Sequence, residues 1–411
     1  MPPRFTSFLA YAGAVGIIIG TILVLTQTKW GGVESPVTGN GKVVEAPINA
    51  STSTAASQSA AVASSDISPA TSSPKKTSSS VKTAPVKQPE QSTPPPSSPP
   101  ANATTPPADA SDGFQAFRIE NPYPFPPQIF EVTNNEAREA LVNILCAARS
   151  GSLRPISASG IIIDGKGVIL TNAHVAQYVL LSSDPQVDLS CTIRTGSPAV
   201  ARFIPEVLYI PPVWVKEHAS DIKTARPTGT GEHDYALLRI NGTIDGSPLP
   251  FSFPSLPFDA REGIGFPDDS VLVASYPAEF IGGMTAQLNL HPVTSVTRIM
   301  SLLTFGTIEG TVDLVSVGGV IGAQSGSSGG AVVNAWGRLI GLISTTSEGE
   351  TTAERDLRAI TMSYINRDIS AQSGQDLAGI LAGDVAEEAR AWNADEAPAL
   401  IKLLIDQLKS R

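Results

Sequence analysis

A glycine-flanked serine with apolar segments on both sides constrains this chain most strongly. Residues 326–330 read Gly-Ser-Ser-Gly-Gly, and an apolar Ala-Val-Val follows at residues 331–333. Glycine tolerates the backbone conformations of a tight turn, and a serine exposed on such a turn can attack a carbonyl carbon. Composition alone would also fit a flexible linker, but the β-rich flanks favour a turn inside a sheet. Ser328 is therefore a candidate nucleophile.

Chain order separates two kinds of serine hydrolase. The same stretch fits the G-x-S-x-G pattern of an α/β-hydrolase, in which the catalytic acid and then the histidine follow the serine. The chain has four histidines, and the last of them, His291, precedes Ser328. This excludes the α/β-hydrolase order and leaves the order histidine, aspartate, serine.

Two further motifs supply a histidine and an aspartate in that order. Residues 160–171 read as a β-hairpin that leads into Thr-Asn-Ala-His-Val, which ends at Val175. A histidine at the end of a strand, here His174, is placed to act as a general base. Further along, His-Asp-Tyr-Ala-Leu-Leu puts Asp234 at the start of an apolar strand, where a carboxylate can orient an imidazole. A lone histidine or aspartate is more often structural, so the combination carries the argument.

Together the three motifs resemble those of the chymotrypsin/trypsin-like serine peptidases, especially bacterial members such as the HtrA/Deg peptidases. The resemblance covers residues 152–365. It implies that Ser328 is the nucleophile, that His174 takes and returns its proton, and that Asp234 orients His174. It also implies that the backbone N–H groups of Gly326 and Ser328 form the oxyanion hole.

The chain departs from the family pattern at two positions. Ser327 stands where zymogen-activated relatives have an aspartate, so activation by a newly cut N-terminus lacks its anion here. The base of the specificity pocket falls near Gly322 with no acid close by, so small or apolar side chains are the expected preference. The resemblance implies further substrate contacts at Ser344 and Thr345. No PDZ domain is expected after the peptidase domain, where the resemblance to HtrA/Deg proteins stops.

The expected fold class is mainly β. Short β runs separated by Gly, Pro and Asp predict barrels or a sandwich. The resemblance implies two antiparallel β-barrels of chymotrypsin type with the site between them, barrel one at about residues 140–250 and barrel two at about 265–370. The strands are expected at residues 159–163, 167–171, 187–195, 199–210, 235–240, 270–275, 293–304, 310–315, 330–334 and 339–345.

Helical spacing appears on both sides of the β region. A short helix is expected at residues 136–145, running toward Cys146. The peptidase domain is expected over residues 113–370, followed by a helical tail at 371–411. Helices within that tail are expected at residues 375–381, 385–392 and 398–408.

The N-terminal part differs in composition. Residues 8–26 form an apolar run without a charge, near the lower end of the roughly 17–25 residues that span a bilayer as a helix. No convincing cleavage site follows, and Trp30 suits a membrane interface, so an uncleaved signal anchor is expected over residues 1–30. A cleavable signal peptide is the alternative. Residues 31–112, rich in Ser, Thr and Pro, predict a disordered linker. The catalytic domain would then lie outside the cytoplasm.

The chain contains two cysteines, which could form a disulfide. Cys146 and Cys191 bracket His174, and an extracytoplasmic domain would favour a disulfide between them; two buried free thiols are the alternative. The net charge is −10, and the absence of a basic patch argues against nucleic-acid binding. No metal or cofactor is expected, because His218 and His233, like His291, lack metal-ligand spacing. These three histidines are expected to be structural or surface residues. The oligomeric state stays open.

The expected function is a membrane-anchored extracytoplasmic serine endopeptidase that cleaves protein or peptide substrates through an acyl-enzyme. One alternative is a catalytically silent binding module with a peptidase fold. Another is a peptidase limited to self-processing, which would release its own domain from the linker. The presence of all three residues, His174, Asp234 and Ser328, favours the active enzyme.

Overall fold

The computed structural model describes residues 108–109, 117–148, 153–224, 229–278, 288–306, 310–318, 326–346 and 356–410. All of them belong to the second of two compact units, Pro94–Arg411. The expected signal anchor and nearly all of the expected linker lie outside these residues. Within the described ranges, no helix is long and apolar enough to cross a membrane.

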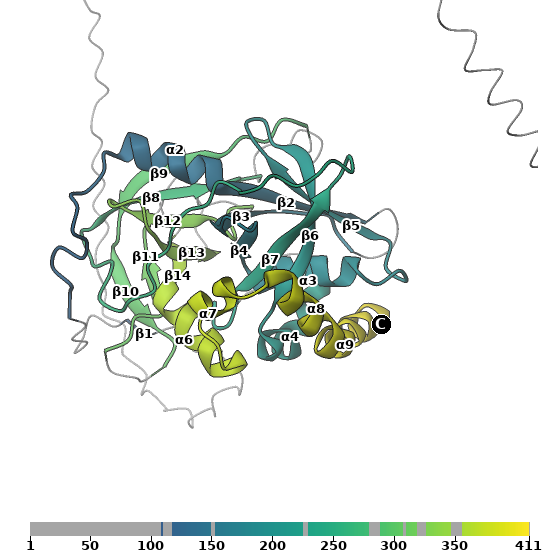
Figure 1. Ribbon diagram of the computed structural model, residues 1–411. Coiled ribbons are helices and arrows are strands. Elements are labelled where there is room, and N and C mark those ends of the chain that lie inside the picture. The colour runs from purple at the N-terminus through teal and green to yellow at the C-terminus, as the bar shows by residue number, and fades with distance from the viewer. Residues whose placement is uncertain are drawn as a thin grey trace, which may run out of the picture. The chain divides into compact units, whose positions relative to one another are not determined.

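Six strands close into an antiparallel barrel, as predicted for the first half of the domain (Figure 1). Their order around the barrel is β2-β3-β4-β7-β6-β5. The strands are β2 (Leu141–Ala148), β3 (Ile156–Asp164), β4 (Val168–Thr171), β5 (Leu189–Thr195), β6 (Val200–Tyr209) and β7 (Ala236–Thr243).

Both faces of β3 and β4 are buried along most of their length, which explains their continuous apolar runs. Side chains alternate along a strand, so Ile161 and Ile162 of β3 enter different core clusters. The cluster that holds Ile161 continues into the second sheet. The cluster that holds Ile162 is completed by helices, among them α3 (Ala173–Ser182) and α9 (Ala397–Lys409).

The second half of the domain is the expected antiparallel sheet, but among the described residues it is a curled sheet and not a closed barrel. Its eight described strands follow the order β1-β10-β11-β14-β13-β12-β8-β9. Closure would require the two end strands, β1 (Ala108–Asp109) and β9, to pair, and the described residues contain no such pairing. Over the part of the chain that the structure describes, the sheet does not join its ends. The other strands are β8 (Ser270–Ser275), β9 (Val293–Arg298), β10 (Ser301–Thr304), β11 (Leu314–Ser316), β12 (Ala331–Asn334), β13 (Leu339–Thr346) and β14 (Leu357–Thr361).

The helix expected at residues 136–145 lies earlier in the chain. Helix α2 spans Phe130–Ala140, and Leu141 already begins strand β2. Strand β2 pairs with β3 on one edge and with β5 on the other. Hydrogen bonds to these two strands, of which β5 is the more distant in sequence, override the local helical spacing.

Two of the C-terminal helices pack on strands, and the other two pack on helices. The three expected helices are present as α7 (Leu377–Ala382), α8 (Val385–Asp395) and α9, and they follow an additional helix, α6 (Met362–Ser373). Helix α6 packs on β13 and β14, and α8 packs on β6 (Figure 1). Helix α9 contacts α3, α4 (Pro212–His218) and the short 3₁₀ helix Ala219–Lys223. Leu400 and Leu404 of α9 thereby enter the core of the barrel half.

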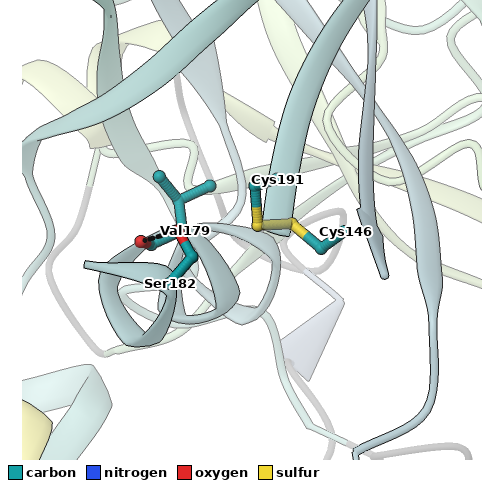
Figure 2. Close-up of a disulfide and its surroundings, with 4 residues drawn as sticks. All are labelled: Cys146, Val179, Ser182 and Cys191. Carbon is teal, nitrogen blue, oxygen red and sulfur yellow. Dashed lines mark hydrogen bonds between the residues drawn. A yellow bond between two sulfur atoms is a disulfide. The ribbon is translucent and has the colours of Figure 1, made fainter. Parts of the chain in front are cut away.

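The two cysteines form the expected disulfide. Cys146 of β2 and Cys191 of β5 are directly opposite in the register of the two strands, and their sulfur atoms are bonded. Figure 2 shows the disulfide with Val179 and Ser182 of helix α3, and both cysteines share a core cluster with Val179. The bond therefore closes a chain segment that contains His174.

Candidate active site

The histidine motif forms the junction between strand β4 and helix α3. Asn172 is the residue before the helix, and His174 lies in the first helical turn. The side chain of Asn172 is fully buried and donates a hydrogen bond to the backbone oxygen of Asp234 at 2.8 Å. The Thr-Asn-Ala-His sequence therefore fixes the histidine and also holds the segment that carries the aspartate.

Asp234 faces His174 at two points. The carboxylate lies 2.9 Å (Oδ2) and 3.1 Å (Oδ1) from Nδ1 of the imidazole. Oδ1 also accepts the backbone N–H of His174 at 3.0 Å, so the carboxylate satisfies a free donor at the start of helix α3. These contacts direct Nδ1 toward Asp234 and leave Nε2 as the ring nitrogen for proton transfer.

Electrostatics within this pair favour opposite charges. Burial raises the pKa of Asp234, but the charge of His174 and the hydrogen bonds from His174 and Ser344 outweigh it, so the pKa lies below its ordinary value. Burial lowers the pKa of His174, but the charge and hydrogen bond of Asp234 outweigh it, so the pKa lies above its ordinary value of 6.5. Asp234 is thus an anion that stabilises a protonated imidazole.

Ser344 joins this pair from the second sheet. Its side chain is 7% exposed, and its hydroxyl donates a hydrogen bond to Oδ2 of Asp234 at 2.8 Å. The sequence suggested a substrate contact for Ser344, whereas the structure gives its hydroxyl a partner inside the site. Thr345 follows it on strand β13. Gly322 lies outside the described residues.

The serine motif forms a tight turn before strand β12. Gly326 has φ +95° and Gly329 has φ +81°, a region that glycine enters without steric cost. A Cβ on Gly329 would lie 2.0 Å from the backbone oxygen of Ser159, so the close approach also demands glycine. Ser328 is half-buried, and its backbone oxygen accepts the N–H of Ser159 at 2.8 Å.

The serine turn and the histidine junction share a neighbour. Thr171, three residues before His174, donates its hydroxyl to the backbone oxygen of Ser159 at 2.8 Å. The same hydroxyl lies 2.5 Å from the position of a Cβ on Gly329. The structure therefore brings the segment before His174 against the residue after Ser328.

Sequence reasoning missed two residues of this site. Asn172 was read only as part of the histidine motif; its side chain makes no cap hydrogen bond and instead reaches Asp234, so no local signal pointed to this role. Ser159 was read as the first residue of a strand. A serine within an otherwise apolar strand was the available signal, because a buried hydroxyl needs partners.

Three comparisons with known proteins place this geometry in context. Residues 158–342, which include His174, Asp234 and Ser328, match the family of the trypsin-like peptidase domain. A search of solved structures found a serine endoprotease from Yersinia pestis at 20% identity and a TM-score of 0.38, covering 60% of this chain and 68% of that chain. A search of curated proteins found no match. On the family match alone, residues 158–342 of this chain are a trypsin-like peptidase domain, the domain of the chymotrypsin/trypsin-like serine peptidases.

Proposed function

We propose that this chain is a serine endopeptidase that uses Ser328, His174 and Asp234 as a catalytic triad. The match of residues 158–342 to the trypsin-like peptidase domain supports a serine protease that acts on proteins or peptides. The observation that carries the triad is the contact of His174 Nδ1 with Asp234. This contact occupies Nδ1 and leaves Nε2 to take the proton. The turn that carries Ser328 lies against the strand that leads to His174.

The proposed reaction has two steps. Ser328 Oγ attacks the carbonyl carbon of the scissile bond while Nε2 of His174 takes the hydroxyl proton. The resulting oxyanion receives hydrogen bonds from the N–H groups of Gly326 and Ser328. The intermediate collapses, the C–N bond breaks, and His174 gives its proton to the leaving amine. Water then hydrolyses the acyl-enzyme by the reverse proton transfers, which releases the acid and restores Ser328.

We also propose that the domain works outside the cytoplasm, anchored by the apolar run at residues 8–26. The disulfide supports this location, because such bonds persist in oxidising compartments. Alkylation of the full chain in intact cells, with and without a reductant, tests it. Modification of Cys146 and Cys191 only after reduction is the expected result, and modification without a reductant would contradict it.

The catalytic proposal is tested with the full chain and its Ser328→Ala variant. Each is treated with a fluorophosphonate probe and with unfolded casein. We expect labelling and casein cleavage by the wild type and neither by the variant. Absence of labelling in both folded proteins would point to a binding module. Labelling with cleavage of the chain itself but not of casein would point to self-processing.

A further inference from the structure

Ser159 of strand β3 contacts both residues of the proposed oxyanion hole. Its side chain is fully buried. Its hydroxyl donates to the backbone oxygen of Gly326 at 2.8 Å and accepts the backbone N–H of Tyr276 at 2.8 Å. Its own N–H donates to the backbone oxygen of Ser328 at 2.8 Å. One residue of the barrel thus fixes the carbonyl groups of Gly326 and Ser328.

We propose that Ser159 is a positioning residue for the oxyanion hole, an inference that rests on the proposed serine peptidase function. The N–H of Ser328 belongs to the peptide between Ser327 and Ser328. The peptides on either side of it carry the carbonyl groups of Gly326 and Ser328, and Ser159 holds both. Because the peptide is planar, the Ser328 N–H turns together with the carbonyl of Ser327. That carbonyl accepts the N–H of Gly330 at 2.9 Å, and the flanking peptides held by Ser159 restrict its remaining rotation.

Glycine gives this turn its shape but cannot make it rigid. Gly326 reaches φ +95° because it has no Cβ, and the same freedom makes other conformations accessible to it. A Cβ there would lie 2.8 Å from both the backbone oxygen of Tyr276 and the backbone N of Ala278. The turn therefore packs against the segment after strand β8, and the Ser159 hydroxyl bridges Tyr276 to Gly326.

A hydroxyl is suited to this bridge because it donates and accepts at once. Alanine at position 159 would leave the N–H of Tyr276 and the carbonyl of Gly326 without this shared partner. The backbone N–H of residue 159 would still hold Ser328. The substitution should therefore allow the peptide after Gly326 to move, whereas the carbonyl of Ser328 stays hydrogen-bonded to residue 159.

The same residue connects the turn to the general base. The backbone oxygen of Ser159 accepts the Thr171 hydroxyl at 2.8 Å, and His174 follows three residues later. The oxyanion donors and the base thus share one anchor on strand β3. Misplacement of reacting groups by about 1 Å can cost about 100-fold in rate, so a shared anchor matters more for the rate of the chemical step than for substrate binding.

The test compares the full-length wild type, Ser159→Ala and Ser363→Ala. Ser363 is a buried serine whose hydroxyl contacts Thr361 and the backbone oxygen of Val312, and it serves as the matched control for loss of a buried hydroxyl. The rate of labelling by a fluorophosphonate is measured over a range of probe concentrations. This gives the maximal rate of inactivation and the probe concentration at half of that rate, and melting temperatures are recorded alongside.

For Ser159→Ala we expect the maximal labelling rate to fall about 10–100-fold, with the half-saturating concentration changed less than about threefold. Ser363→Ala should label at the wild-type rate. If Ser159→Ala labels at the wild-type rate, or if only the half-saturating concentration rises, the inference is wrong. If the alanine variant does not fold, Ser159→Cys, with its weak S–H donor, replaces it under the same criteria. A wild type that does not label overturns the proposed function and this inference together.

Discussion

Ser344 donates a hydrogen bond to Oδ2 of Asp234 at 2.8 Å across 110 residues of sequence. The carboxylate thus receives donors from both halves of the domain, His174 from the barrel half and Ser344 from the open sheet. Because the carboxylate is buried, its orientation depends on these donors. The proposed acid of the triad is therefore held across the boundary between the two sheets.

Replacement of this hydroxyl should impair turnover. In Ser344→Ala we expect kcat for casein to fall about 10-fold, because a hydrogen bond to a charged group contributes about 1.5–3 kcal/mol and about 1.4 kcal/mol corresponds to a tenfold change. Steady-state kinetics with fluorescent casein measures the effect. Ser363→Ala, which also loses a buried hydroxyl, is the control and should retain wild-type kcat. Equal kcat in wild type and Ser344→Ala would show that Ser344 does not hold Asp234 for catalysis.

The pH dependence of activity should follow the raised pKa of His174. A general base must be neutral, so activity is lost as pH falls through that pKa. Because Asp234 raises the pKa above 6.5, kcat/KM should rise with pH and reach half its maximum above pH 6.5. In Asp234→Asn this midpoint should move to lower pH and kcat should drop by about 10⁴. An unchanged midpoint in that variant would contradict the pairing. Asp245→Asn, at an exposed carboxylate, is the control and should keep the wild-type profile.

A second histidine–carboxylate pair links the segment before Asp234 to helix α6. His233 Nδ1 lies 2.9 Å from Asp368 Oδ2. Burial lowers the pKa of His233, but the hydrogen bond and charge of Asp368 outweigh it, so the pKa is raised above 6.5. The pair therefore adds stability below about pH 6.5, and this contribution is lost as pH rises through the folded-state pKa. Sequence analysis assigned His233 a structural role without a partner.

His233→Gln should remove this pH-dependent contribution. The difference in unfolding free energy between wild type and variant should be largest near pH 5.5 and should shrink above the raised pKa, as measured by urea unfolding at several pH values. Tyr235→Phe is the control, because it removes the 2.8 Å hydrogen bond from Tyr235 to Asp368 but keeps the pair. The difference in unfolding free energy between Tyr235→Phe and wild type should not shrink as pH rises through the pKa of His233. A pH-independent difference for His233→Gln would exclude the ionic contribution.

The disulfide should contribute to the stability of the half that carries the base. Cys146 and Cys191 are 45 residues apart, and closing a loop of that length stabilises by about 4 kcal/mol in the chain-entropy account. The Cys146→Ser, Cys191→Ser double variant should therefore have a free energy of unfolding lower by about that amount, measured by urea unfolding. Wild type in reductant should show the same loss of unfolding free energy as the double variant. Reductant should not change the unfolding free energy of the double variant. Wild-type stability in the double variant would show that strand pairing alone fixes this region.

The sequence indicated the candidate site residues in order and the strands around them because those signals are local. The apolar runs at β3, β4 and β7 predict strands wherever their partners lie. The helical spacing that predicted α7 and α8 is also local. Asp376 and Asp384 directly precede these helices, and their side chains accept backbone N–H groups of the first turn.

Long-range contacts decided the rest. The 110 residues between Asp234 and Ser344, and the 167 between Ser159 and Gly326, separate groups that meet only after the two sheets pack. Whether the second sheet closes depends on the pairing of its end strands, which no local pattern specifies. A motif thus determined which side chains are available for chemistry. Packing determined which buried donors and acceptors hold them, because those partners are selected by distance in space and not along the chain.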